Sequence, residues 1–486
     1  MSSALAEMPP QPVDVLVIGA GPAGARAALR AQACGLDVLL ADENHDAGGQ
    51  VWRPIPPGFA RALGGATSPE ARDGDALRAE LRRAGVRCLF SHKLWNIGTN
   101  LRADLIGPEG SVSWQPRAVI AATGATERVV PFPGWTLPGV IGLAAATILL
   151  KSQNMLPGRR TVVAGAGPLL LAVATGILKA GGEVMAVLDL ASPGDWLRTL
   201  PSLASRPDLL WQGLQWQARL RAAGVPVLHR HGIRSVEAAS SGFEVVTQRV
   251  DAGGQPIADA TAPMFAADAV TVGHGLVPGT DITRLLRACH RYAVELGGWV
   301  AEADADGRTS VAGLYVAGDG AGIAGAAAAS AHGELAALAC AHDLGRLDAT
   351  THARERDRLQ SSWHRSARFG HAMAGLMALR DGAVAGIAPD TVVCRCEDVT
   401  RAEIDAAARD GARDMNQLKA WTRCGMGPCQ GRSCGDVAGA LLALHVGSRE
   451  AAGCFTGRAP LRPVSLAEVA GEYTYADIPI PKAAPL

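Results

Sequence analysis

Five cysteines lie between residues 394 and 434 of a chain that is otherwise rich in alanine, glycine and leucine. They form two pairs, Cys394-x-Cys396 and Cys424-x4-Cys429, and Cys434 follows them. Four thiolates that meet at one point suit either zinc or an iron–sulfur cluster. Structural zinc usually uses pairs with about two to four intervening residues, so a C-x-C pair is a poor zinc chelate. A [2Fe–2S] rhomb can take two neighbouring cysteines on one iron and two on the other.

These four cysteines are therefore candidate metal ligands, with a [2Fe–2S] cluster favoured, zinc as the alternative and a disulfide in third place. Cys434 is left over, either beside the cluster or simply packed. Short helices are expected to position the pairs. Thr400-x-x-Glu403 is a capping box that opens a helix ending near Gly411, and another helix is expected from about Gln430 onward.

A second constellation lies near the N-terminus, where residues 14–43 show a strand-helix-strand pattern of apolar residues. The turn after the first strand carries G-x-G-x-x-G, which permits a tight turn, close approach of a pyrophosphate and close packing of helix on strand. The candidate cofactor contacts of this turn are Gly19, Ala20, Gly21, Pro22, Ala23 and Gly24. An acid at the end of the second strand would accept hydrogen bonds from a ribose; Asp42 fits by strand length, and Glu43 is the alternative.

Three later motifs extend this pattern: GGQVWR with Gly49 and Gln50, VIAATGA with Thr123-Gly124, and GLYVAGDGAG with Gly318-Asp319. With them the chain resembles the glutathione-reductase-like flavoproteins, which have two dinucleotide-binding domains. This resemblance implies FAD in the first fold, with Asp319 bonded to the flavin side chain and Thr123-Gly124 at the crossing between domains. Asp319 as an ordinary helix N-cap is the alternative.

Residues 160–189 repeat the strand-helix-strand plan, with Gly165 and Gly167 as candidate cofactor contacts and Asp189 at the strand end. In the resembled superfamily this second domain binds NAD(P)H. Leu170 stands where the third glycine is expected, so the sequence indicates the fold but leaves nicotinamide binding open. Residues 196–227 read as an amphipathic helical insertion, which either packs on the core or receives a partner protein.

The composition excludes several classes of function. Lys+Arg and Asp+Glu both number 46, so the basic surplus of a nucleic-acid-binding protein is absent. We find no secretory signal and no apolar run long enough to span a membrane, which predicts a cytoplasmic location. The sequence offers no general base or nucleophile, and His274 and His332 are interpreted as packing or capping residues.

The cysteine segment resembles the bacterioferritin-associated-ferredoxin-like (BFD-like) [2Fe–2S] module, and residues 12–450 resemble one subunit of heteromeric amino-acid and imino-acid dehydrogenases. Relatives include octopine and nopaline oxidases, hydrogen cyanide synthase, hydroxyproline and proline dehydrogenases, and the α subunit of sarcosine oxidase. The resemblance implies a partner β subunit with its own FAD that oxidises the C–N bond. It further implies an electron acceptor such as a quinone, and it allows for a small γ subunit, FMN at a subunit interface, and ATP or NAD in place of FAD.

We therefore predict an α/β protein with two dinucleotide-binding domains and a small helical [2Fe–2S] domain. The expected parts are a FAD-type domain (1–130 and 310–345), an inserted nucleotide-binding-like domain (131–309), a helical connector (346–388), the cluster domain (389–450) and a docking tail (451–486). The predicted function is electron transfer within a dehydrogenase complex. The alternatives are a self-contained NAD(P)H-dependent flavin and [2Fe–2S] reductase, and a binding module without enzymatic activity.

Overall fold

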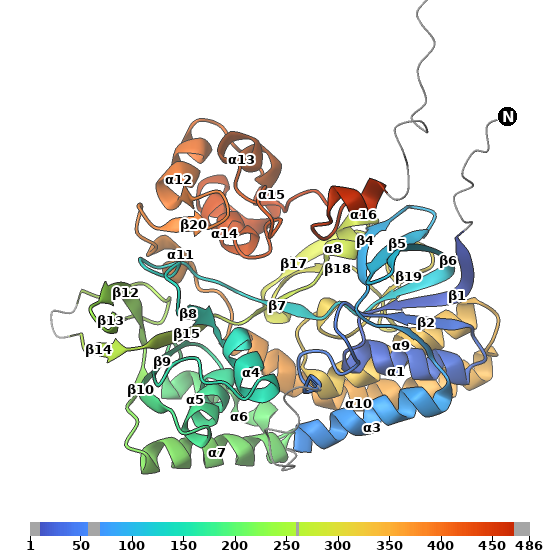
Figure 1. Ribbon diagram of the computed structural model, residues 1–486, viewed down its shortest axis with the longest axis horizontal. Helices are drawn as coiled ribbons and strands as arrows, with labels where there is room; N and C mark the ends of the chain where they lie inside the picture. Colours follow the sequence, from blue (N-terminus) through green and yellow to red (C-terminus); the bar gives the residue numbers. More distant parts are fainter. Residues whose placement is uncertain (1–9, 57–68, 259–261, 471–486) are drawn as a thin grey trace, which may run out of the picture.

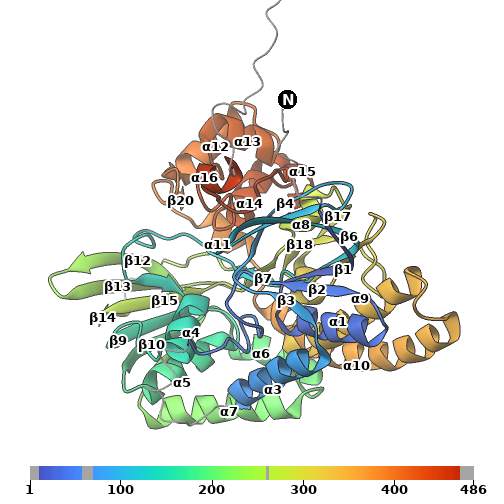
Figure 2. The same cartoon turned by 45° about the vertical axis from the view of Figure 1, so that its right-hand side comes forward.

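The chain forms two units, each with a largely parallel β-sheet that packs against helices, and a group of short helices follows them (Figure 1). The structure is a computed structural model that describes residues 10–56, 69–258 and 262–470. The two sheets lie side by side, and the C-terminal helices lie above them (Figures 1 and 2). The end of the expected docking tail, residues 471–486, lies outside the described residues.

The first sheet has seven strands in the order β3-β2-β1-β6-β5-β4, with β19 also paired to β6. Its strands are β1 (Gln11–Ile18), β2 (Val38–Ala41), β3 (Arg87–Leu89), β4 (Lys93–Ile97), β5 (Ala103–Gly107), β6 (Gly110–Ala121) and β19 (Leu314–Val316). The run β3-β2-β1-β6-β19 is parallel, and its strands are apolar because both faces are covered. Helices α1 (Pro22–Ala33), α3 (Pro69–Ala84) and α9 (Ala326–Asp343) lie on one face (Figure 1).

The second sheet is fully parallel, in the order β11-β10-β9-β15-β8. Its strands are β8 (Val140–Gly142), β9 (Arg160–Gly165), β10 (Glu183–Asp189), β11 (Val227–His229) and β15 (Ala269–Gly273), and its helices are α4 (Leu143–Ser152), α5 (Leu169–Lys179), α6 (Pro193–Leu203) and α7 (Pro207–Ala222). An antiparallel meander of β12 (His231–Ala239), β13 (Gly242–Arg249) and β14 (Met264–Ala267) packs beside it. The expected helical insertion is thus α6 and α7, and it exposes Trp211 and Leu214.

Two short strands connect the units. β7 (Ala125–Glu127) leads out of the first unit and pairs antiparallel with β16 (Leu276–Pro278), which leads back. Because the chain has already returned at β16, the next four elements lie with the first unit. They are α8 (Asp281–Leu285), β17 (His290–Ala293), η1 (Val294–Leu296) and β18 (Gly298–Ala301). Ile282 and Ala301 belong to the same apolar cluster as Leu16 of β1. The structure therefore places these residues with the first unit, whereas the sequence placed them with the second.

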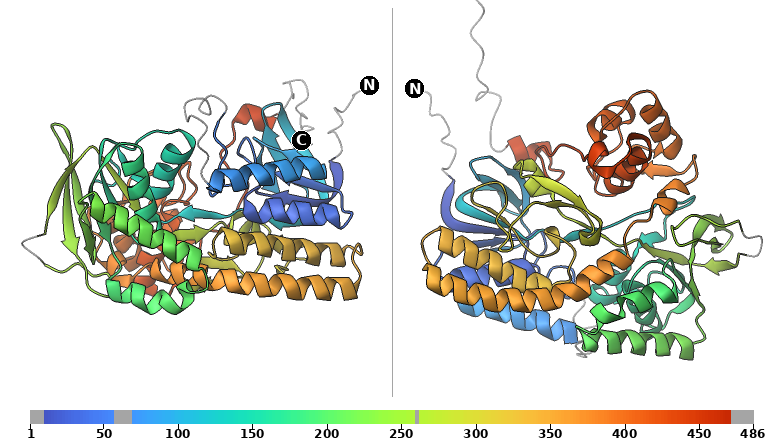
Figure 3. Two further views of the ribbon diagram at one scale, coloured as in Figure 1. Left: turned by 90° about the horizontal axis from the view of Figure 1, so that it is seen from below. Right: turned by 180° about the vertical axis from the view of Figure 1, so that it is seen from behind.

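Helix α10 (Ala349–Leu376) is the connector toward the C-terminal helices. It runs along α9 and then reaches α6 of the second unit (Figure 3). The helices after it are α11 (Asp381–Ala385), α12 (Arg401–Arg409), α13 (Met415–Thr422), α14 (Gly435–Val446), α15 (Arg449–Ala452) and α16 (Leu466–Ala470), with β20 (Val392–Cys394) and β21 (Val399–Thr400) between α11 and α12. Among the described residues, no helix combines the length and apolar character that crossing a membrane requires.

The capping box predicted before α12 is present, because Thr400 N–H donates to Glu403 at 2.7 Å and Glu403 N–H donates to the Thr400 hydroxyl at 3.3 Å. The helix expected from about Gln430 begins later, at Gly435. Gln430 has φ +53° and Gly431 has φ +81°, and this left-handed backbone cannot continue into a right-handed helix.

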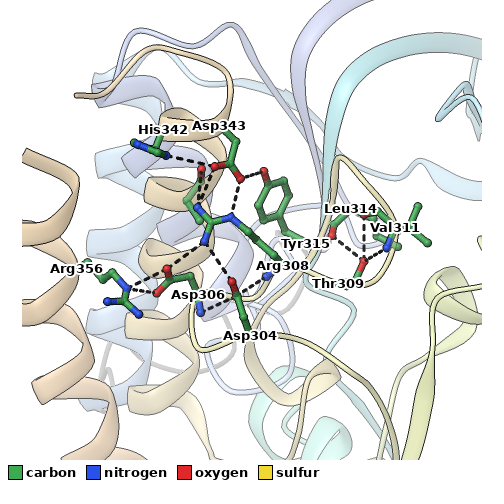
Figure 4. Close-up of polar contacts among 11 residues, drawn as sticks. Asp304, Asp306, Arg308, Thr309, Val311, Leu314, Tyr315, His342, Asp343 and Arg356 are labelled. Atoms are coloured by element: carbon green, nitrogen blue, oxygen red, sulfur yellow. Dashed lines mark hydrogen bonds and ion pairs between the residues drawn. The ribbon is translucent and has the colours of Figure 1, made fainter. Parts of the chain in front are cut away.

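A charged network fastens α9 and α10 to the first sheet (Figure 4). Arg308 Nε donates to Asp343 of α9 at 2.7 Å, and the hydroxyl of Tyr315 on β19 donates to the same carboxylate at 2.6 Å. Arg308 also contacts Asp306 at 3.1 Å, and Arg356 of α10 donates to Asp306 at 2.7 Å. Burial would raise the pKa of Asp343, but the hydrogen bonds from Arg308 and Tyr315 lower it to about 2.

This network predicts a pH-dependent contribution to stability. Because the pKa of Asp343 is lower in the folded than in the unfolded chain, its stabilisation is complete above about pH 4 and is lost as the pH falls toward 2. We expect Asp343→Asn to lower the thermal midpoint at pH 6, and the difference from wild type to shrink between about pH 4 and pH 2.5. Calorimetry of both proteins across this range measures it; a difference that is independent of pH would contradict the assignment.

Candidate functional site

The first glycine-rich turn has the geometry of a pyrophosphate cradle. Gly19 has φ +98°, and a Cβ atom added there would lie 2.4 Å from the carbonyl oxygen of Ala122. A Cβ added at Gly24 would lie 1.8 Å from the oxygen of Gly19, so only glycine allows α1 to pack this closely on the turn. Gly21 is the N-cap and Pro22 is the first residue of α1. The free N–H groups and the positive dipole end of α1 therefore face the turn.

The acid beside this cradle is Asp42. Its side chain is buried, and its Oδ2 accepts the N–H of Ala20 at 2.5 Å while its Oδ1 accepts the N–H of Asn44 at 2.7 Å. Glu43 instead points to the surface, where it pairs with Arg462 at 3.2 Å. The structure therefore places Asp42, which strand length favoured, at the edge of the glycine turn.

The late Gly-Asp motif lies against the same helix. A Cβ added at Gly318, which has φ +68°, would be 2.6 Å from the Cβ of Ala23. Asp319 Oδ1 accepts the N–H groups of Ala324 and Gly325, both at 2.9 Å, so this oxygen caps the loop before α9. Oδ2 has no hydrogen-bond partner within the part of the chain that the structure describes. Burial raises the pKa of Asp319, and the hydrogen bonds from the N–H groups of Ala324 and Gly325 offset part of this rise.

The remaining predicted contacts surround this cradle. A Cβ added at Gly49 would lie 2.8 Å from the Cα of Gly21, whereas Gln50 is exposed and accepts a hydrogen bond from Arg53 at 2.9 Å. The Thr123 hydroxyl donates to the carbonyl of Gly279 at 2.5 Å, and Gly279 N–H donates to the carbonyl of Gly124 at 2.8 Å. Thr123-Gly124 thus lies where the two connecting segments cross.

His332 forms a hydrogen bond to the turn that contains Gly318 and Asp319. Its Nδ1 accepts the N–H of Gly318 at 3.2 Å, and burial lowers its pKa to about 4. Burial likewise lowers the pKa of His274 to about 4. Both imidazoles are therefore uncharged at neutral pH and sit in packing positions.

The two acids give a matched test of the cradle. We expect Asp42→Ala to weaken binding of an adenine dinucleotide by about tenfold or more, because a hydrogen bond to a charged group contributes about 1.5–3 kcal/mol. Glu43→Ala should change the affinity by less than about twofold, since its carboxylate faces solvent and Arg462. Calorimetric titration of nucleotide-stripped protein measures both; equal losses in the two variants would contradict the placement.

The five clustered cysteines converge in the C-terminal unit. Sγ atoms of Cys394, Cys424 and Cys434 lie within 4.8 Å of one another, with Cys424 and Cys434 3.9 Å apart. Cys429 lies close enough to Cys434 and Cys396 for its pKa to depend on both, so the five thiols form one group. They come from β20 and the turn after it, from the turn after α13, and from the N-terminus of α14. This donor set fits a soft metal or an iron–sulfur cluster.

Two members of this group, Cys394 and Cys429, favour the thiolate form, whereas hydrogen bonding to the Cys394 thiolate raises the pKa values of Cys424 and Cys434 and burial raises that of Cys396. Hydrogen bonds from the thiols of Cys424 and Cys434 lower the pKa of Cys394 to about 2. A hydrogen bond from the Cys434 thiol lowers the pKa of Cys429 to about 4. Thiolates are the form in which cysteine binds metals.

Cys434, which the sequence left outside the ligand set, lies in the middle of the group. Its Sγ lies 3.9 Å from that of Cys424 and within 4.8 Å of that of Cys394, and it is the N-cap residue of α14. One signal in the sequence points to it: four residues separate Cys424 from Cys429, and four also separate Cys429 from Cys434.

Sequence reasoning also missed the residues that dock the cysteine unit. Arg432, within the cysteine loop, pairs with Asp281 of α8 at 2.8 Å, and Arg462 pairs with the same carboxylate at 3.2 Å. Since Arg462 also pairs with Glu43, ion pairs run from the cysteine loop to the residue beside Asp42. No local pattern in the sequence marks these pairs, because their members are far apart along the chain.

Comparison with family models identifies the family. The model of the pyridine nucleotide-disulphide oxidoreductases matches residues 13–333, about two thirds of the chain. The chain belongs to this family. A second model, that of the sarcosine oxidase A3 domain, matches residues 389–472, where the cysteine group lies. The family members are flavin-dependent oxidoreductases, so the enzyme class expected from the motifs is confirmed.

Individual relatives extend over nearly the whole chain. The A subunit of opine oxidase from Rhizobium meliloti (strain 1021) is 37% identical, with 94% of this chain and 98% of that protein covered. Hydrogen cyanide synthase subunit HcnB from Pseudomonas aeruginosa is 32% identical, with 92% and 96% covered. The crystal structure of L-proline dehydrogenase from P. horikoshii shares the fold with a TM-score of 0.66 at 19% identity, covering 95% of this chain and 80% of that one. The resemblance to this group of dehydrogenase subunits is thereby confirmed.

Proposed function

We propose that the chain is the electron-transfer subunit of a heteromeric FAD-dependent dehydrogenase that oxidises the C–N bond of an amino acid, imino acid or opine. The observation that carries this proposal is the presence of two sites in one chain, a dinucleotide cradle and a group of five thiols. The names of the opine oxidase and hydrogen cyanide synthase relatives support a subunit role, since each is named as one subunit of its enzyme.

The first fold is proposed to hold FAD. The N–H groups of the glycine turn and of α1 would bind the pyrophosphate, Asp42 the ribose, and the Oδ2 of Asp319 the flavin side chain. ATP or NAD is the alternative occupant, because the turn and Asp42 would serve any adenine nucleotide. When bound, FAD accepts two electrons and a [2Fe–2S] cluster transfers them singly.

The thiol group is proposed to hold a [2Fe–2S] cluster through four of its five members. Cys394 and Cys396 supply one pair, and Cys429 is a member of the second pair. We assign the fourth position to Cys434, because it lies at the N-terminus of α14, where the positive end of the helix dipole favours a thiolate ligand. Cys424, which is fully buried with its Sγ 3.9 Å from that of Cys434, would then pack beside the cluster.

The chain's own residues would bind and position these cofactors, and a partner β subunit with its own FAD would bind and oxidise the substrate. The two buried histidines, uncharged and packed, offer no acid for this chemistry. A small γ subunit, FMN at the interface between the larger subunits, and a quinone or similar acceptor would complete the complex, in the cytoplasm.

Metal and cofactor analysis of the anaerobically purified chain tests the proposal. About two irons and two acid-labile sulfides per chain, with bound flavin and no zinc, are the expected result. Zinc in place of iron, together with the absence of any nucleotide, would overturn electron transfer and leave a binding module.

A further inference from the structure

The second nucleotide fold departs from the first at the turn that would hold a pyrophosphate. In the first fold the middle glycine, Gly21, is extended, with φ −69° and ψ −175°. The equivalent Gly167 has φ +92°, and the residue after it, Pro168, is the N-cap of α5. The path of the backbone through the second turn is therefore different, and its N–H groups do not form the cradle seen at Gly19–Gly24.

Leu170 gives the physical reason for this difference. At Gly24, the equivalent position of the first fold, an added Cβ would lie 1.8 Å from the Gly19 oxygen. A leucine in that geometry would collide with the turn. In the second fold the Leu170 side chain is instead fully buried in the apolar core beneath α5, together with Val163 and Ile177. The altered turn makes room for this side chain.

The chain's own connector covers the altered turn. A Cβ added at Gly167 would lie 2.5 Å from the Sδ of Met377, the C-cap residue of α10. The backbone of Met377 is also held, because its carbonyl accepts a hydrogen bond from the buried guanidinium of Arg128 at 3.3 Å. Met377 is therefore fixed against the glycine whose bare backbone a pyrophosphate would approach.

Asp189, the acid at the end of β10, already has hydrogen-bond partners within the chain. Asp189 Oδ1 accepts the N–H of Ala191 at 2.9 Å, and its Oδ2 accepts the indole N–H of Trp196 at 3.0 Å, with His229 3.4 Å away. Asp189 is buried under these partners, whereas a ribose would need the same oxygens. Trp196 and Met377 belong to one apolar cluster, formed between α6 and the end of α10.

The space that remains at this edge of the sheet is small. A cavity of about 300 Å³ adjoins Gly165, and its walls include Pro131, Phe132 and the segment 386–388. Its size is at the lower limit of ligand pockets. Arg380, just before α11, reaches across to the carbonyl of Leu190 at 3.3 Å and to Asp195 at 3.4 Å, which fastens the connector over this edge.

We propose that the second nucleotide fold does not bind NAD(P)H and instead serves as the anchoring site for the connector, with Met377 and Trp196 in the place of the dinucleotide. The fold is retained because it fixes the end of α10 and the start of the C-terminal unit. Electrons therefore enter the chain from a partner protein and not from a nicotinamide bound here. On this proposal the chain does not act as a self-contained NAD(P)H-dependent reductase.

Hydrogen exchange of the flavin-loaded full chain tests this assignment, with NADH and NADPH as probes. We expect no added protection of residues 165–172 and 189–197 at millimolar nucleotide, and no reduction of the flavin. Protection of these segments by either nucleotide would overturn the proposal. Because exchange locates the binding, nucleotide bound at the first fold is distinguished from nucleotide bound at the second.

A second hydrogen-exchange experiment tests whether Met377 anchors the connector on the second nucleotide fold. Met377→Ala should raise exchange at residues 165–172 and 376–388 by about tenfold, because it opens the contact on Gly167. Met155→Ala is the matched control, since this methionine is exposed on the same unit, and it should leave both segments unchanged. Unchanged exchange in Met377→Ala would overturn the anchoring. Iron and flavin contents, measured on the same samples, report separately on the proposed function.

Discussion

Arg128→Met is expected to loosen the docking of the C-terminal unit by about 3–5 kcal/mol, because it removes one partner of a buried ion pair. Arg128 Nε pairs with Asp436 of α14 at 2.6 Å, and both side chains are buried. Its other nitrogens donate to the carbonyls of Gly297 at 2.7 Å and of His274 and Met377, each at 3.3 Å. One guanidinium thus joins the first unit, the loop between β15 and β16, the connector and α14. Hydrogen exchange of α14 and the thermal midpoint measure the loss.

A double variant at Arg128 and Asp436 distinguishes the cost of an unpaired buried charge from the cost of lost side-chain packing. Burial would raise the pKa of Asp436, but the charges of Arg128 and Arg449 lower it, so the carboxylate stays ionised at neutral pH. In Arg128→Met the ionised Asp436 keeps only Arg449, at 2.6 Å. Replacing Asp436 by leucine in the same protein should recover part of the loss, because an apolar pair fills the space without an unpaired charge. A single variant as stable as wild type would contradict the role of Arg128.

Cys434→Ser is expected to remove nearly all bound iron and to abolish the cluster's visible absorption, as Cys394→Ser, Cys396→Ser and Cys429→Ser should. A hydroxyl is a poor ligand for iron in place of a thiolate, and loss of one of four ligands opens the cluster to solvent. Iron and sulfide assays on anaerobic samples, with flavin content as the internal standard, measure the effect.

The matched control is Cys424→Ser, which removes a thiol from the same group, 3.9 Å from Cys434. It should keep about two irons per chain, with a modest loss of thermal stability from a buried hydroxyl. The reverse pattern, with iron lost in Cys424→Ser and kept in Cys434→Ser, would support the ligand set expected from the sequence. Iron retained in all five variants would refute the site.

The first nucleotide fold was predictable because its determinants are local. The three glycines, the helix and the terminal acid lie within residues 19–42, and their spacing specifies the turn. Strand length also favoured Asp42 over Glu43, in agreement with the side-chain positions in the structure. Leu170 raised the question of nicotinamide binding, but the sequence could not show that Met377, from a distant helix, covers the turn.

Other features depend on contacts between segments far apart along the chain. The partners of Arg128 come from four separate elements, so no motif surrounds it. The place of Cys434 depends on how the turn at Gln430 folds, where two residues with positive φ delay the start of α14. The return of the chain at β16, before residue 281, is set by its pairing with β7, which sequence spacing did not indicate.

Electron transfer through this protein is tested most sharply by an anaerobic reductive titration of the purified chain, followed by its visible absorption spectrum. We predict flavin bands together with broad absorption, both bleached by dithionite, with about three electrons taken up per chain: two by the flavin and one by the cluster. A chain that takes up no electrons and contains zinc in place of iron would contradict electron transfer through this protein.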